Sequence, residues 1–253
     1  MKLQSGHKNG QASIQTGEVG IHLPFVVWGM TKTPLDRSET MFPDLTRDDV
    51  FRLETRRLWL RWPRHADGAA IARFAGDKAV AEMTAAIPHP YPAEGATTFV
   101  FESRKSNALG QALRLAITPK RKPTQLIGLV GIDAPAADEP TPVLGYWLGA
   151  PYWGRGYMTE GARALVDAYF AYMDGRELVA AARTDNPASR RLLEKCGFAH
   201  AGSGSKAYPA RGAVLPVDRF RLDRHAWDRL KPWPDTGLPH GPPGERIKMA
   251  QAS

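Results

Sequence analysis

Cysteine is nearly absent from this chain, in which Cys196 is the single example among 253 residues. One cysteine cannot form a disulfide within the chain, so small disulfide-stabilised secreted folds are excluded. A reducing compartment fits this composition, and we expect a cytoplasmic protein. No histidine stands in a recognisable partner motif for Cys196, which favours a small buried hydrophobic residue over a nucleophile.

Long hydrophobic runs are also missing, and this excludes a membrane-spanning helix of ordinary length. The apolar stretch from Ile21 to Met30 is short and contains Pro24. It has neither a basic leader next to it nor a small-residue cleavage site, so we do not interpret it as a signal peptide. The sequence therefore predicts no membrane partner, and no residue cluster suggests a bound metal.

Acidic residues are outnumbered by basic ones, and the formal net charge is +8. Residues 51–230 carry all of it, with 26 Lys and Arg against 18 Asp and Glu. A basic domain suits an acidic partner, such as a phosphate-rich cofactor or a nucleic acid. The basic residues are spread over several segments without interleaved aromatics or a recognition motif, which makes nucleic-acid binding the least favoured function. Simple solvation of the surface is the alternative for most of these positions.

Periodic hydrophobic patterning is confined to the middle of the chain. Residues 1–50 are predicted to be a poorly ordered leader, and Met41 begins a more conventional start within it. Residues 231–253 are rich in Pro and Gly and are predicted to be an extended tail. Residues 51–230 are then one domain, because a chain of this length holds one domain plus extensions by default.

Strand-like and helix-like segments alternate within that domain, which indicates an α/β fold around one sheet. The patterns predict strands at 57–62, 111–118, 126–132, 143–149, 177–184, 198–202 and 216–223. They predict helices at 66–84, with a break near Gly76, and at 93–107. A third helix follows a glycine turn and ends at about Met173, and a fourth begins after Asn186.

The most informative stretch, residues 145–161, reads GYWLGAPYWGRGYMTEG. An aromatic-rich strand passes into a turn at Gly154 and Gly156, and the turn opens directly into an amphipathic helix. Glycine lets the backbone turn sharply and approach a ligand closely, and the first amides of a helix attract anions. This order of elements predicts a pyrophosphate site, although a Gly-x-Gly pair alone is more often an ordinary turn.

A second motif follows about 30 residues later, where residues 186–198 read NPASRRLLEKCGF. Asn186 suits the N-cap of a helix and Pro187 its first position, while Gly197 suits the left-handed residue that ends it. By itself the segment is typical of a short, well-capped core helix. Together with the glycine turn it resembles the GNAT superfamily of N-acetyltransferases, and the resemblance covers about residues 51–225.

Further segments resemble the branch of that superfamily that contains the ribosomal-protein-alanine acetyltransferases. They are Arg56 to Trp62, the Ile87-Pro88-His89-Pro90-Tyr91-Pro92 loop and the aromatic strand before the glycine turn. The resemblance implies a single GNAT-like α/β domain with a mixed, twisted sheet, splayed central strands and flanking helices. In the family, the pantetheine arm of the cofactor lies in the splay and pairs with exposed backbone like an added strand. His89 and Tyr91 would lie beside the acceptor.

The resemblance implies acetyl-CoA as the co-substrate. The residues implied in its binding are Trp147, Leu148, Trp153, Gly154, Arg155, Gly156, Tyr157, Met158, Thr159, Asn186 and Ser189. Most would act through backbone amides, while the Arg155 guanidinium offers a forked cation to phosphate. Trp147 and Tyr157 also suit plain packing between the sheet and a helix.

Ser189 is the implied catalytic residue, because its hydroxyl stands where the family can protonate the leaving thiolate. A serine in the first turn of a helix commonly caps it or faces solvent, and this is the alternative. Many members of the family place a tyrosine acid seven residues after the motif asparagine, where this chain has Leu193. The tyrosine mechanism at that position is therefore excluded.

The general base is left open by the sequence. The branch often carries a glutamate where this chain has Val143. Glu102, Asp133 and His89 are the alternatives among side chains, and an ordered water is a further one.

These features predict an enzyme that moves an acetyl group from acetyl-CoA to an amine by direct attack in a ternary complex. The acceptor amine belongs to a protein N-terminus or to a small molecule, and the sequence does not choose between them. A catalytically silent acyl-CoA-binding sensor is the rival from another class, because the usual carboxylate is missing at Val143.

Overall fold

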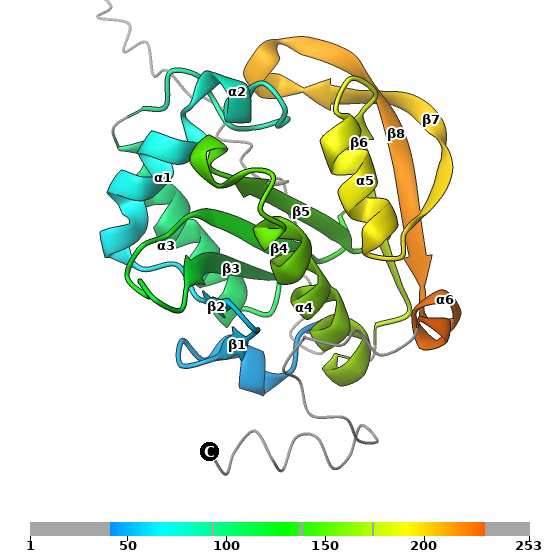
Figure 1. Cartoon of the computed structure of the whole chain (residues 1–253), viewed down its shortest axis with the longest axis horizontal. Coiled ribbons are helices and arrows are strands. Elements are labelled where there is room, and N and C mark those ends of the chain that lie inside the picture. Colours follow the sequence, from blue (N-terminus) through cyan, green and yellow to red (C-terminus); the bar gives the residue numbers. More distant parts are fainter. Residues whose placement is uncertain (1–40, 93, 137–138, 174, 231–253) are drawn as a thin grey trace, which may run out of the picture.

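The computed structural model describes residues 41–92, 94–136, 139–173 and 175–230, and Figure 1 shows their arrangement. One eight-stranded sheet forms the centre, in the order β1-β2-β3-β4-β5-β6-β8-β7. The strands are β1 (Arg52–Glu54), β2 (Leu58–Arg61), β3 (Ala112–Pro119), β4 (Gly128–Asp133), β5 (Val143–Leu148), β6 (Glu177–Arg183), β7 (Ala199–Tyr208) and β8 (Ala213–Asp223).

Neighbouring strands pair antiparallel throughout the sheet except at its middle, where β5 and β6 run parallel. β5 and β6 pair at one position, Val143 with Val179, and then diverge. The predicted mixed sheet with splayed central strands is therefore confirmed.

Helices cover both faces of the sheet. They are α1 (Gly68–Ala75), α2 (Lys78–Ala81), α3 (Gly95–Ala108), α4 (Tyr157–Tyr172), α5 (Pro187–Lys195) and α6 (Arg224–Arg229). The predicted helix over 66–84 breaks near Gly76 as expected, and α2 begins again after Asp77, whose carboxylate accepts a hydrogen bond from the Ala79 amide at 2.9 Å.

Alternating residues of the central strands build two cores. Leu113, Leu115 and Ile117 of β3 belong to the core that contains the buried faces of α4 and α5. Ala116, between two of them, belongs to the core that contains α1 and α3. Side chains alternate between the faces of a strand, so a strand covered on both faces is apolar nearly throughout. The molecule is a three-layer α/β/α sandwich (Figure 1).

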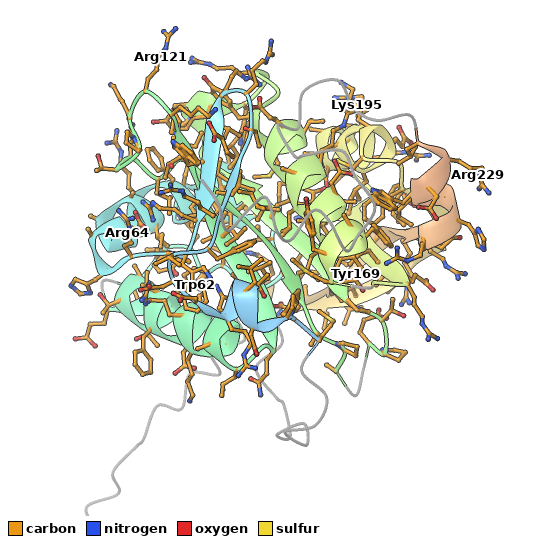
Figure 2. All side chains as sticks on the ribbon, turned by 90° about the horizontal axis from the view of Figure 1, so that it is seen from below. Trp62, Arg64, Arg121, Tyr169, Lys195 and Arg229 are labelled. Atoms are coloured by element: carbon orange, nitrogen blue, oxygen red, sulfur yellow. The ribbon has the colours of Figure 1, made fainter. Side chains whose placement is uncertain are left out.

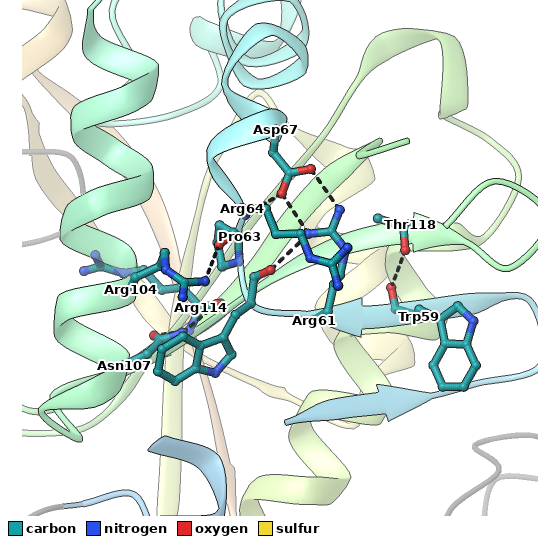
Figure 3. A network of polar contacts seen from close by, with 10 residues as sticks. Trp59, Arg61, Pro63, Arg64, Asp67, Arg104, Asn107, Arg114 and Thr118 are labelled. Carbon is teal, nitrogen blue, oxygen red and sulfur yellow. Dashed lines mark hydrogen bonds and ion pairs between the residues drawn. The ribbon is translucent and has the colours of Figure 1, made fainter. Parts of the chain in front are cut away.

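Polar side chains buried at the end of β2 and beside β3 form hydrogen bonds within the protein. The Arg61 guanidinium donates two hydrogen bonds of 2.8 Å to the Asp67 carboxylate, and both side chains are less than one-tenth exposed (Figure 3). Nearby, the Asn107 amide side chain bonds both backbone groups of Arg114. These bonds fix the chain before α1 and the end of α3 against the sheet. Breaking the Arg61–Asp67 pair would leave a buried charge without its partner, which is strongly destabilising.

Two parts of the fold differ from the sequence prediction. Residues 41–50 were assigned to the leader, but Phe42 is 1% exposed and lies in the core with α4, so this segment packs onto the domain. The predicted strands at 198–202 and 216–223 are longer, and form the β7–β8 hairpin. Most of β7 is exposed and rich in Gly and Ser, so its strand conformation comes from pairing with β8 rather than from a hydrophobic pattern. Residues 1–40 and 231–253 lie outside the described residues.

Basic side chains lie on well-separated elements, as the sequence suggested. Figure 2 shows Arg121, Lys195 and Arg229 pointing outward from the β3–β4 turn, α5 and α6. Among the described residues, no helix has the length and apolar character needed to cross a bilayer.

Replacing Phe42 by Ala tests whether the domain begins before residue 51. We expect a loss of roughly 3–5 kcal/mol in the free energy of unfolding, because the substitution empties a fully buried aromatic position. Urea unfolding of Phe42→Ala measures it. Leu45→Ala, at a 39% exposed position in the same segment, is the control and should change stability by less than about 1 kcal/mol. Equal stability of the two variants would contradict the assignment of Phe42 to the core.

Candidate functional site

A cleft of about 1230 Å³ opens where β5 and β6 diverge. Its walls come from β5, β6, the start of α4, α5, the segment after α2 and the β7–β8 hairpin. β4 holds β5 and β8 holds β6 on their outer edges, so both strands are fixed although they do not pair with each other beyond Val143. The inner edge of β5 therefore offers backbone groups to a ligand.

The glycine turn lies at one end of this cleft. Gly154 and Gly156 have φ values of +72° and +74°, which side-chain-bearing residues rarely adopt. A Cβ at Gly154 would meet no atom within 4 Å, so the space beside the backbone is open. Gly156 is the N-cap of α4, and both glycines line the cleft. The amides of the first turn of α4 and the positive end of its dipole thus face the cavity, an arrangement that suits an anion.

Arg57 fastens this turn to the sheet. Its guanidinium donates from Nε to Glu160 at 2.6 Å and from Nη1 to the Arg155 carbonyl at 2.9 Å, and it lies 4.5 Å from the centre of the Tyr157 ring. Glu160 also accepts hydrogen bonds from the Thr55 hydroxyl and the Arg57 amide. Burial raises the pKa of Glu160, but these hydrogen bonds and the Arg57 charge outweigh it and lower the pKa below its usual value. Sequence reasoning missed Arg57 and Glu160, because the two residues are more than 100 positions apart in the chain.

Trp153 forms a second fastening. Its indole Nε1 donates to the Leu148 carbonyl at 2.6 Å, which ties the turn to the end of β5. The Trp153 side chain is still 47% exposed, and it lines the cleft.

The start of α5 forms the opposite wall. The Asn186 side chain accepts a hydrogen bond from the Ser189 amide at 3.0 Å, which confirms the predicted N-cap. Ser189 Oγ lies 2.8 Å from the hydroxyl of Tyr146, which reaches across from β5. Both side chains line the cleft. Burial raises the pKa of the Tyr146 hydroxyl far above its usual range, although the Ser189 hydrogen bond opposes this, so the tyrosine stays protonated at any physiological pH.

The structure brings nearly all the predicted cofactor residues to this one cleft. They are Trp147, Leu148, Trp153, Gly154, Gly156, Tyr157, Met158, Thr159, Asn186 and Ser189. Arg155 is the exception, since it is exposed and outside the lining, and its carbonyl is held by Arg57. Their contact with a cofactor stays a prediction.

At the far end of the cleft, a bridge of hydrogen bonds joins α2 and the segment after it to the end of β6 and to the turn of the β7–β8 hairpin. Arg183 donates to the Glu82 carbonyl at 2.6 Å, and Arg211 donates to the carbonyls of Ala81 and Ile87. The Ala210 amide adds a bond of 3.1 Å to Ala85. Residues 79, 80 and 82–87 line the cleft at this end.

His89 and Tyr91 lie farther along the same segment, outside the lining of the cleft. His89 Nδ1 is 2.8 Å from the Gly76 carbonyl, and Tyr91 is partly buried against the core of α1 and α3. Their predicted contact with an acceptor stays a prediction, while residues 82–87 are the part of this segment that reaches the cavity.

Val143 stands where the related branch often has a glutamate, and a carboxylate of the adjacent strand lies beside this position. Val143 pairs in register with Asp133 of β4, so their side chains lie side by side on one face. Asp133 lines the cleft and accepts a 3.0 Å hydrogen bond from the Arg114 guanidinium. Glu102 belongs to α3 and is outside the lining.

Cys196 is fully buried behind α5, and burial raises the pKa of its thiol to about 12. The thiol is therefore protonated at neutral pH, which agrees with the predicted structural role. Within the described part of the chain, no group of three or more His, Cys, Asp or Glu side chains is placed to hold a metal ion.

Comparison with known proteins supports one family. Residues 57–199, more than half of the chain, match the family model described as Acetyltransferase (GNAT) domain. N-acetyltransferase p20 of Bacillus licheniformis is 25% identical over 170 residues, which is 67% of this chain and 94% of that protein.

Solved structures share the fold at lower identity. The ribosomal-protein-S5-alanine acetyltransferase of Vibrio fischeri superposes with a TM-score of 0.60 at 20% identity, over 72% of this chain and all of that one. The microcin C7 self-immunity acetyltransferase MccE, in complex with acetyl-CoA and AMP, gives 0.58 at 21% identity over 66% and 93% of the two chains. With its glycine turn, splayed sheet and matched domain, the chain belongs to the GNAT family of acetyltransferases.

Proposed function

We propose that this protein transfers the acetyl group of acetyl-CoA to an amine bound in the same cleft. The observation that carries the proposal is the single β5–β6 pair at Val143 and Val179, beyond which the two strands enclose the cavity. The glycine turn at one end suits a pyrophosphate, and the inner edge of β5 suits an extended arm that ends in a thioester. MccE, an acetyltransferase whose fold this chain shares, was solved with acetyl-CoA bound.

The reaction needs a neutral amine, a fixed thioester and a stabilised leaving group. The amine nitrogen attacks the thioester carbon, the C–N bond forms, and the C–S bond breaks with its electron pair moving to sulfur. Holding both reactants at near-attack distance supplies several kcal/mol of the barrier reduction. A backbone amide of β5 can stabilise the carbonyl oxygen, and the Ser189 hydroxyl would donate a hydrogen bond to the leaving sulfur.

Asp133 is the carboxylate that we assign to proton removal from the amine, directly or through water. Among Glu102, Asp133 and His89, it is the side chain that lines the cleft, and it lies beside the position of Val143. The ion pair with Arg114 fixes its orientation.

The acceptor belongs to one of two classes, a protein N-terminus or a small amine. The V. fischeri neighbour is named for an alanine of a ribosomal protein, and MccE is named for immunity to microcin C7. The bridge at Arg183 and Arg211 limits the space at the acceptor end, which favours a slender or small amine over a folded surface.

Release of CoA thiol separates an enzyme from a silent binding module. The purified protein is incubated with acetyl-CoA and a panel of peptides with N-terminal alanine and small amines, and free thiol is measured over time. Amine-dependent thiol release supports the proposed function. Binding of acetyl-CoA without release for any amine would support the sensor interpretation instead.

Gly156→Val should abolish the stabilisation that acetyl-CoA gives to the wild-type protein. The valine cannot adopt a φ of +74° without strain, and its Cβ would lie 3.4 Å from the Arg57 guanidinium that holds the turn, so the amides that face the cleft would be displaced. The measurement is the melting temperature with and without acetyl-CoA. Gly202→Val is the matched control, because Gly202 also has a positive φ but lies outside the cleft lining. Undiminished stabilisation of Gly156→Val would place the cofactor elsewhere.

Ser189→Ala should lower kcat by about 10- to 100-fold and leave the KM for acetyl-CoA nearly unchanged, because the hydroxyl interacts with the sulfur as the thiolate develops. Steady-state kinetics with an amine from the panel measure both constants. A mutant with a raised KM and wild-type kcat would show that Ser189 only orients the pantetheine.

Asp133→Asn should lower kcat by about 10- to 100-fold, because the amide keeps the size of the side chain but cannot accept the amine proton. Stabilisation by acetyl-CoA should persist, which checks that the cleft is intact. Glu102→Gln is the control, since Glu102 is outside the lining. Wild-type kcat in Asp133→Asn across pH 6–9 would assign proton removal to water.

A further inference from the structure

Tyr146 and Ser189 face each other across the mouth of the splay. The two hydroxyl oxygens are 2.8 Å apart, the ordinary length for a hydrogen bond between hydroxyls. Tyr146 belongs to β5 and Ser189 to the first turn of α5, so the bond joins the two walls of the cleft. Both residues line the cavity, beside the strand edge that suits the thioester arm.

The direction of this bond decides what Ser189 can do. When Tyr146 donates to Ser189 Oγ, the serine hydrogen is free to point into the cleft. The other acceptor near Tyr146 is the Ser189 carbonyl, at 3.5 Å, which is too long to compete with a contact of 2.8 Å. Hydroxyls in series also polarise one another, so a serine that accepts from tyrosine is a stronger donor.

We propose that Tyr146 is a positioning residue that aims the Ser189 hydroxyl at the leaving sulfur and strengthens its hydrogen bond to the thiolate. The inference rests on the proposed function, because it needs a thioester in this cleft. As the C–S bond breaks, the electron pair moves to sulfur, and the thiolate accepts a hydrogen bond from Ser189, which accepts from Tyr146. The amine proton leaves by the base, and neither hydroxyl gives up its own proton.

Two features support hydrogen-bond donation over proton transfer. A complete transfer through the pair would leave a phenolate at Tyr146, and burial of the ring disfavours that charge. A thiolate is also a weaker base than an alkoxide or a buried phenolate, so it holds a hydrogen bond without taking the proton. The pair then stabilises the charge where it develops, as preorganised donors do in acyl transfer.

Titration of the CoA thiol bound to the protein tests this inference without an acceptor. The probe is CoA itself, and the ultraviolet absorbance of its thiolate is followed from pH 6 to 10. The variants are Tyr146→Phe, Ser189→Ala and the double variant. Tyr169→Phe is the matched control, because Tyr169 also has a partly buried hydroxyl, which donates to the Glu177 carbonyl at 3.1 Å, away from the cleft lining.

Loss of a hydrogen bond to the thiolate raises the pKa of the bound thiol. We expect a rise of about one unit in Ser189→Ala and about half a unit in Tyr146→Phe. The double variant should equal Ser189→Ala, because Tyr146 acts through Ser189. With an active amine, Tyr146→Phe should lower kcat about 3- to 10-fold with an unchanged KM for acetyl-CoA.

A wild-type thiol pKa in Tyr146→Phe would overturn the inference, and so would additive shifts in the double variant, which would mean that the two hydroxyls act independently. A purely structural role for Tyr146 would change KM and melting temperature but not the pKa of the bound thiol. Failure of the wild-type protein to bind CoA would show in the melting temperature before any titration, and it would overturn the proposed function itself.

Discussion

Separation of β5 from β6 after one pair of residues is the constraint on which the rest of the site depends. A strand edge left open inside a protein leaves backbone groups unpaired, which is costly unless a ligand or water bonds them. The sheet tolerates it because β5 keeps its full ladder with β4, and β6 keeps its ladder with β8. Two of the walls of the cleft follow from this geometry, since α4 comes after the end of β5 and α5 after the end of β6.

Arg57 and Trp153 make the glycine turn rigid before any cofactor arrives. A turn with two left-handed glycines has little stiffness of its own, because glycine has wide conformational freedom. The guanidinium of Arg57 holds the Arg155 carbonyl and Glu160, and the indole of Trp153 holds the end of β5. Amides fixed in this way lose little further freedom on binding, which strengthens the attraction for an anion. The carbonyl of Arg155 is part of this anchor, while the contact of its side chain with phosphate stays a prediction.

Local signals in the sequence predicted the turn and the caps correctly. Gly156 and Asn186 act on their own helices within a few residues, so neighbouring letters suffice to identify them. The contacts of Arg57, Asp133 and Tyr146 depend on strand register and on elements distant in the chain, which no local pattern carries. The segment around Phe42 was misjudged for a similar reason, since the burial of Phe42 depends on core residues that are distant in the chain.

The hydrogen bond between the Tyr146 and Ser189 hydroxyls depends on the distance between the two walls of the cleft. Tyr146 comes from the wall that continues into the glycine turn, and Ser189 comes from the wall that begins after β6. Hydrogen bonds between hydroxyls have oxygen–oxygen distances of about 2.5–3.0 Å, so the 2.8 Å contact persists only over a narrow range of wall separations. A cofactor arm that widened the splay would break the bond and leave the serine hydrogen undirected. An arm that fits between the walls keeps the bond, so in the proposed mechanism donation to the sulfur is coupled to correct seating of the thioester. This chain has Leu193 where many family members place a tyrosine, and the proposal gives the donor role to the hydroxyl pair formed between the two walls.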